Sequence, residues 1–360
     1  MKLELVDRTI GWIAQSKAGN ADWPRLIDLI GKYPVAMIDY PFPIIPAQGS
    51  HIKARMEIPP SLLASDPEAL KRISMSGCCH AAISMRFGSA SLDEAKKAAL
   101  AAHRHLKSVS LKLPDASKMD AQALDECIAA AWDAGISSII FCDGQSVLSP
   151  QETFGLIREL VQRSCCAIEF CPGNKYGLAA ANAFAALKAG VRRVHTCAGG
   201  LAPSGAAMEE VLFSAKRFLG DKTDTKSIAQ DCGMLLRAAQ RDVPSNKAII
   251  GEDIFAHESG IHVDGVMKNP ALYEAIEPSE VGLSRRLVVG KHSGRKAIRG
   301  KLLDFGVDAS DEAAEIIMHQ VKRLAEKQKR ALADSQLLSL YAEYAYGVAE
   351  KAEVLASGAG

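Results

Sequence analysis

Residues 108–171 read SVSLKLPDASKMDAQALDECIAAAWDAGISSIIFCDGQSVLSPQETFGLIRELVQRSCCAIEFC, and this stretch decides the fold. Short β-rich runs at 108–114, 138–143 and 167–171 alternate with two stretches of helical period. Strands that alternate with helices at this spacing are typical of parallel βαβ units. Ser149 and Pro150 suit the cap and first turn of the second helix, and Gly135 stands where a left-handed end of the first is expected.

The same alternation continues outward in both directions. Further strands are expected at 3–9, 35–40, 73–79 and 193–198, and an eighth near 248–255. Seven or eight βα units favour a closed (β/α)8 TIM barrel of the α/β class over an open doubly wound sheet. We predict this barrel over 1–245, a small α-rich subdomain over 246–300, and C-terminal helices over 301–360.

Composition narrows the class of protein. The 360 residues carry 43 basic and 42 acidic side chains, and this balance gives no electrostatic footprint for nucleic acid. With 48% hydrophobic residues a large core is expected, while the apolar runs are far shorter than the ~20 residues of a membrane span. The N-terminus MKLELVDRTI has no signal-peptide pattern, and nine cysteines without one fit reduced thiols. We expect a cytoplasmic protein without nucleic-acid or membrane partners.

The densest polar cluster lies at 251–294, in FAHESGIHVDGVMKNPALYEAIEPSEVG and LVVGKHSG. A histidine near neutral pKa suits proton transfer, and a tyrosine hydroxyl can donate to a developing oxyanion. An alternative reading is structural, with polar side chains satisfying irregular backbone. The candidate residues of this cluster are His257, Glu258, His262, Asp264, Tyr273, Lys291, His292 and Ser293.

These motifs resemble those of the homocitrate synthase, 2-isopropylmalate synthase and citramalate synthase family, the Claisen-condensing DRE-TIM metallolyases. The nearest branch is the homocitrate synthase of nitrogen fixation. Weaker likeness covers most of the chain, including FCDGQSVLSP at 141–150 and GLAAANAFAALKAGVRRVHT at 177–196. The resemblance implies a (β/α)8 barrel with small subdomains, and an acyltransferase that condenses acetyl-CoA with a 2-oxo acid on a divalent metal.

The chain departs from the family where the metal is bound. VDRTIGWIAQ matches the family's first motif at Asp7, Thr9 and Gln15, but Gly11 replaces its catalytic arginine. The positions of the metal ligands are taken by Trp12, Cys171, Gly173 and Gly199. An indole has no lone pair to offer a metal. We therefore expect the usual metal to be lost and name no cofactor.

His262 and Tyr273 match positions that contribute to catalysis in the family, on the acetyl-CoA side. The resemblance also implies that the subdomain of one subunit reaches over the barrel of its partner. We hypothesise a pseudoenzyme or partner subunit that donates His262 and Tyr273 in trans. The assembly would be a homodimer or a hetero-oligomer with an intact homologue, with a small 2-oxo acid or CoA as ligand.

Other constellations stay open. A rebuilt acyltransferase or C–C lyase could use Lys175, Cys171 and His262, because a desolvated lysine can form a Schiff base; Lys112 is also at a strand end. A soft-metal or redox site could join Cys142, Cys171 and Cys197 with His195 or Asp143. An active synthase despite the substitutions is a further alternative. The candidate substrate-binding residues are Asp7, Asp39, Arg86 and Asp143.

Overall fold

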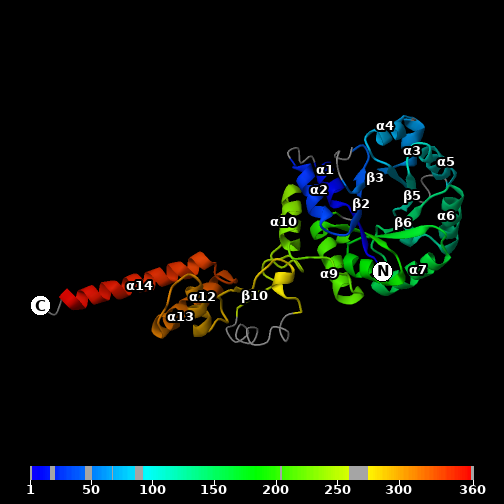
Figure 1. Ribbon diagram of the computed structural model, residues 1–360. Coiled ribbons are helices and arrows are strands. Elements are labelled where there is room, and N and C mark those ends of the chain that lie inside the picture. Colours follow the sequence, from blue (N-terminus) through cyan, green and yellow to red (C-terminus); the bar gives the residue numbers. More distant parts are fainter. Residues whose placement is uncertain are drawn as a thin grey trace. The chain divides into compact units, whose positions relative to one another are not determined.

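The structure is a computed structural model that describes residues 2–16, 21–44, 51–66, 68–85, 92–202, 205–258 and 275–357. The chain divides into two compact units, Met1–Ile250 and Gly251–Gly360. Figure 1 shows the first unit in blue to green and most of the second in yellow to red. The division of the C-terminal part at residue 300 stays a prediction.

Eight parallel strands form a closed barrel in the first unit. The strand order follows the chain, and the eighth strand pairs with the first, with Glu4 opposite Arg193. The strands are β1 Glu4–Asp7, β2 Val35–Pro41, β3 Lys53–Ile58, β4 His80–Ser84, β5 Ser108–Leu113, β6 Ser138–Asp143, β7 Ala167–Pro172 and β8 Arg193–Cys197, and β9 Ala206–Ala207 pairs beside β8. The closed ring confirms the predicted (β/α)8 barrel and rules out the open sheet.

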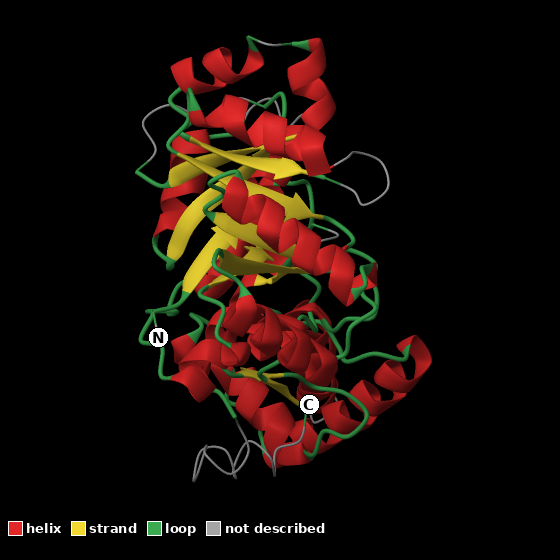
Figure 2. Ribbon diagram, turned by 90° about the vertical axis from the view of Figure 1, so that its right-hand side faces the viewer, coloured by secondary structure: helices red, strands yellow, loops and turns green. Residues whose placement is uncertain are grey.

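Helices surround the strands on the outside of the barrel (Figure 2). Small residues let several of them approach the sheet closely, as at Ala99 in the fifth helix and Ala183 in the eighth, both fully buried. The helices are α1 Thr9–Gln15, α2 Trp23–Gly31, α3 Pro60–Ser65, α4 Ala69–Met75, α5 Leu92–His103, α6 Ala121–Asp133, α7 Pro150–Arg163, α8 Ala179–Ala189, α9 Met208–Leu219 and α10 Ile228–Ala238.

Local sequence sets the ends of these helices. Helix α7 begins with a capping box, in which Ser149 accepts from the Glu152 amide at 3.3 Å and Glu152 accepts from the Ser149 amide at 2.8 Å. Helix α8 ends at Gly190, whose φ of 112° is left-handed and favours glycine. The cap predicted at Ser149 is confirmed.

Two strand predictions are wrong. The segment 73–79 contains the end of α4 and a turn, since Leu70 and Ile73 bury one face of a short helix; the strand follows at 80–84. The eighth strand is β3 and not the segment near 248–255. In β3 the sequence KARMEI alternates, so that Arg55 and Glu57 lie inside the barrel while Met56 packs outside. Because its inner face is charged, β3 does not match the apolar pattern by which the other strands were predicted.

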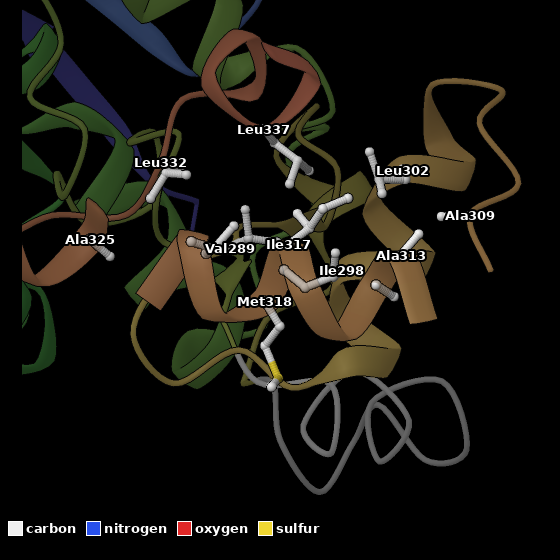
Figure 3. Close-up of a cluster of buried hydrophobic side chains, with 12 residues drawn as sticks. Val289, Ile298, Leu302, Ala309, Ala313, Ile317, Met318, Ala325, Leu332 and Leu337 are labelled. Atoms are coloured by element: carbon white, nitrogen blue, oxygen red, sulfur yellow. The ribbon is translucent and has the colours of Figure 1, made fainter. Parts of the chain in front are cut away.

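The second unit is built around helices. Its elements are β10 Ala256–His257, β11 Arg286–Leu287, α12 Arg295–Asp304, α13 Asp311–Gln328 and α14 Asp334–Ser357. One core joins the three helices, with Leu302, Ile317 and Leu337 all fully buried (Figure 3). Burying each such side chain contributes about 1.5–3 kcal/mol. The bridge between Val289 and Leu332 ties the loop before α12 to the loop before α14.

None of the helices in the described ranges combines the length and the apolar character that a bilayer crossing requires.

Candidate functional site

The middle of the barrel holds a buried arginine. Arg55 is 1% exposed, and its guanidinium contacts Asp39 through Nε at 2.7 Å and Nη2 at 3.1 Å. Its Nη1 donates to Glu169 Oε2 at 2.9 Å and to Ser110 Oγ at 3.3 Å. A two-pronged arginine–carboxylate pair is strong and geometrically specific. Burial opposes ionisation of both acids, but Arg55 outweighs it and holds the pKa of Asp39 and of Glu169 below their usual ranges.

His195 also contacts these side chains, and we call Asp39, Arg55, Ser110, Glu169 and His195 together the Arg55 layer. Its Nε2 lies 3.2 Å from Glu169 Oε2 and 3.4 Å from Arg55 Nη2, and its Nδ1 lies 3.4 Å from Asp39 Oδ2. Burial lowers the pKa of this imidazole, but Cys171, Glu169 and Asp39 together raise it above the usual value. The imidazolium is thus stabilised inside the barrel.

Three charged side chains lie above this layer, at the carboxyl ends of the strands. Arg8 follows β1, and its Nη2 lies 3.4 Å from Glu57 Oε1. Lys112 on β5 pairs with the same carboxylate. Burial opposes the charge on Glu57, but Lys112 and Arg8 lower its pKa. Two cations therefore share one anion at this end of the barrel, where the active sites of barrel enzymes are found.

Cys142 and Cys171 face one another across β6 and β7. Both are buried in a small cluster with Ala82 and Ile140. Arg8 Nη1 donates to Cys171 Sγ at 3.4 Å. A hydrogen bond from Cys142 holds the pKa of Cys171 well below its usual range, and His195 and Arg8 add to this effect against burial. Of the two thiols, Cys171 is therefore the more readily ionised.

The family's metal does not fit the residues at its positions. A Cβ added at Gly173 would lie 2.4 Å from Asp143 O, and one at Gly199 would lie 2.7 Å from Leu236 Cδ1. Gly11 is equally crowded, with Asp39 O at 2.3 Å. Atoms of neighbouring residues in the same chain therefore occupy the space next to these glycines. In the described ranges, no group of three or more His, Cys, Asp or Glu side chains is arranged to hold a metal ion.

Asp7 and Asp143 are engaged by nearby backbone. Asp7 accepts from the amides of Thr9 at 3.1 Å and Ile10 at 3.0 Å, at the start of α1. Burial raises the pKa of Asp7 to about 6. Asp143 accepts from Ser117 Oγ at 2.7 Å and from the Val147 amide at 2.9 Å. Both carboxylates therefore order loops at the strand ends, whereas the third candidate, Asp39, belongs to the Arg55 layer.

The remaining barrel candidates lie apart from this layer. Lys175 is exposed, with its ammonium 2.7 Å from Gln145 Oε1, in the arrangement of a solvated lysine. Cys197 accepts from the Ala202 amide at 3.2 Å, and burial raises its pKa to about 12. It holds the loop after β8. Arg86 lies outside the described residues.

In the second unit, the motif that contains Glu258 is hydrogen-bonded to the motif that contains Gly290 and Ser293. Glu258 Oε1 accepts from the His292 amide at 2.7 Å, and Ser293 Oγ donates to Glu258 O at 3.0 Å. Ser293 also accepts from the Gly290 amide at 2.9 Å. His257 pairs through its backbone, since its carbonyl accepts from the Val288 amide at 3.0 Å. These contacts give Glu258 and Ser293 a structural role.

Lys291 lines a cavity of about 380 Å³ beside Glu258, together with Lys329 and Arg330. Three further candidates of this unit, His262, Asp264 and Tyr273, lie outside the described residues.

Sequence reasoning missed Arg8, Arg55, Glu57 and Glu169. The pattern that could have found two of them, Arg55 and Glu57, is charge at every second position of a strand, as in KARMEI. Alternating side chains point to opposite faces of a strand, so such charges share one face. In a barrel with an apolar outside, that face is the interior.

Comparison with known proteins places the chain in a family. Residues 73–230 match the HMGL-like profile, and residues 249–329 match the profile of the homocitrate synthase post-HMGL domain. The 2-isopropylmalate synthase 2 of Caldanaerobacter subterraneus subsp. tengcongensis is 38% identical over 239 residues, which cover 65% of this chain and 62% of that protein. Homocitrate synthase 1 of Nostoc sp. is 39% identical over 241 residues, covering 66% and 64%. The chain thus spans less than two thirds of the length of these relatives.

Solved structures agree on the fold. An HMG-CoA lyase from Acinetobacter baumannii superposes with a TM-score of 0.58 at 14% identity, covering 71% of this chain and 97% of that one. The carboxyl transferase domain of Rhizobium etli pyruvate carboxylase has a TM-score of 0.53 and also 14% identity, covering 67% and 48%. The barrel, the post-HMGL domain and the relatives lead to one conclusion: the chain belongs to the homocitrate synthase, 2-isopropylmalate synthase and citramalate synthase family of DRE-TIM proteins.

Proposed function

We propose that this chain is a homocitrate synthase-like protein whose own barrel does not perform the metal-dependent condensation. The observation that carries the proposal is the packing at Gly173 and Gly199. A Cβ at Gly173 would lie 2.4 Å from the backbone oxygen of Asp143, and one at Gly199 would lie 2.7 Å from the end of the Leu236 side chain. The backbone contact at Gly173 cannot be relieved by a side-chain movement, and it supports the loss of a ligand at that position.

The mouth of the barrel still suits a small anion. Arg8 and Lys112 both pair with the carboxylate of Glu57, and so place two basic groups at the carboxyl ends of the strands. A carboxylate, such as that of a 2-oxo acid, is a ligand of suitable charge for these two groups. Binding of the acid without turnover is the behaviour that this barrel supports best.

The second unit supports a role as a partner subunit. The contacts among Glu258, His292 and Ser293 join the two motifs that flank His262 and Tyr273 in the sequence. We propose that this chain pairs with an intact homologue and donates His262 and Tyr273 to the partner's barrel. A homodimer is the alternative assembly.

Co-expression with an intact homologue tests the partner role. We expect the two chains to copurify, and the mixed complex to release CoA from acetyl-CoA and a 2-oxo acid. His262→Ala in this chain should then lower turnover at least tenfold, while His319→Ala, which removes an exposed side chain of α13, serves as the control. Normal turnover by the His262→Ala complex would refute donation in trans.

One observation favours a second candidate, an acyltransferase with rebuilt chemistry. Cys171 lies beside Arg8 and is stabilised as a thiolate by Cys142 and His195. Its sulfur could attack the thioester carbonyl of an acyl-CoA, forming a new thioester as the C–S bond to CoA breaks and CoA leaves as the thiolate. Intact-mass spectrometry after incubation with acetyl-CoA would show an added acetyl group that Cys171→Ser lacks. An unmodified wild-type chain would rule this candidate out.

A further inference from the structure

The opposite end of the barrel holds a cavity that none of the proposed chemistry uses. It has a volume of about 510 Å³ and lies where the strands begin, bounded by Glu4, Lys53, His80, Ser108, Arg192 and Arg193. It reaches inward as far as Glu169, in the Arg55 layer. Small-molecule sites commonly measure about 300–1,000 Å³, so the volume suits a small ligand.

The two carboxylates at this cavity are already neutralised. Glu4 is held by Arg193 Nε at 2.8 Å and by Arg192 Nη2 at 3.1 Å. Glu169 accepts from Arg55 and, at 3.3 Å, from Arg193 Nη1. Neither acid therefore has negative charge to spare for a further cation.

The cations at the cavity are in excess. Lys53 is exposed and has no ion-pair partner within the described part of the chain. His80 is half-buried, and its Nδ1 lies 2.6 Å from Ser108 Oγ. Burial lowers the pKa of His80, and Lys53, Arg55, Lys107 and Arg193 lower it further. With both acids paired, the ammonium of Lys53 leaves the lining of the cavity with a net positive charge.

We propose that this cavity is a binding site for a small polyanion with two or more oxyanion groups, held by Lys53, His80 and the arginines at the start of β8. Lys53 supplies the uncompensated charge, and Ser108 supplies a neutral hydroxyl group. A carboxylate ligand and a phosphate ligand share this chemistry. The site is independent of the function proposed for the barrel mouth.

Calorimetry on the full chain at low ionic strength tests the site with citrate, pyrophosphate and acetate. Citrate or pyrophosphate should bind, and acetate should give no measurable heat. Binding of citrate alone identifies a carboxylate ligand, and binding of pyrophosphate alone a phosphate ligand. Lys53→Gln should weaken binding about fivefold or more, while Lys97→Gln, an exposed lysine on α5, should change it less than about twofold.

Two further measurements fix the location. Bound polyanion should raise the pKa of His80 in an NMR titration, with the resonance assigned by its loss in His80→Gln, because the anion offsets the neighbouring cations. This pKa shift of His80 should be absent in Lys53→Gln. The proposal is overturned if neither polyanion binds, if Lys53→Gln binds like Lys97→Gln, or if the polyanion leaves the pKa of His80 unchanged.

Discussion

The barrel and the C-terminal unit carry the family's features unequally. In the barrel, the resemblance aligns Gly11, Gly173 and Gly199 with the family's catalytic arginine and metal ligands, and each of these glycines is closely packed by neighbouring atoms. In the C-terminal unit, Glu258 and Ser293 of the two family motifs still bind each other's segments. The two motifs of the post-HMGL domain therefore lie in a different unit from Gly11, Gly173 and Gly199.

The largest effect is expected inside the barrel, where buried ion pairs have become the organising feature. Arg55→Met leaves Asp39 and Glu169 buried without their main cation, which costs about 3–5 kcal/mol of unfolding free energy. The exposed pair of Lys96 and Asp133 is the control, because Lys96→Met should cost at most about 1 kcal/mol. Urea denaturation of both variants measures the difference, and equal losses would contradict the account of the interior.

The ion pairs of Arg55 with Asp39 and Glu169 also make the stability of the fold depend on pH. The folded pKa values of Asp39 and Glu169 are lowered, so their stabilising contribution is complete above the unfolded pKa of about 4 and is lost as pH falls further. Wild-type stability should decline below about pH 4, and this decline should be weaker in Arg55→Met. A decline of the same size in both proteins would show that other groups cause it.

The next effect concerns the rewritten metal position. Gly173→Ala places a Cβ 2.4 Å from Asp143 O, so we expect a loss of about 1–3 kcal/mol by overpacking. Gly155→Ala in α7 is the matched control, since a Cβ there meets nothing within 4 Å and should stabilise the helix by about 0.5–1 kcal/mol. If Gly173→Ala is as stable as the wild type, a ligand side chain could be accommodated and the contrast between the units weakens.

A smaller effect is expected in the C-terminal unit. Ser293→Ala removes the acceptor of the Gly290 amide and the donor to Glu258, which costs about 1–2 kcal/mol. Ser339→Ala, on the exposed side of α14, should fall within about 0.5 kcal/mol of the wild type. Thermal unfolding of the two variants makes the comparison, and a neutral Ser293→Ala would mean that the motifs are not held by this contact.

The smallest expected effect is on the ionisation of Cys171 and not on the stability of the fold. Because Cys142, His195 and Arg8 lower the pKa of Cys171, its thiolate should absorb near 240 nm at neutral pH. The absorbance should be missing in Cys171→Ser and present in Cys165→Ser, which removes an exposed thiol. A wild-type signal that rises only above about pH 8.5 would place Cys171 among ordinary thiols.

The sequence predicts the barrel because most strands are apolar and separated by helices of clear period. It does not predict β3, since Arg55 and Glu57 make that strand look like a polar loop until the barrel interior is known to be charged. It also does not predict that Arg55 joins Asp39 to Glu169, because these residues lie on three strands and meet only in the closed ring. The contact of Glu258 with His292 depends in the same way on tertiary structure.

The most direct test of the central claim is the purified chain by itself. Its divalent metal content should be measured together with CoA release from acetyl-CoA in the presence of 2-oxoglutarate, pyruvate or 2-oxoisovalerate, with the Nostoc homocitrate synthase 1 as positive control. We expect no stoichiometric metal and no CoA release from this chain, with or without added metal. CoA release that requires a divalent metal and is abolished by a chelator would contradict it.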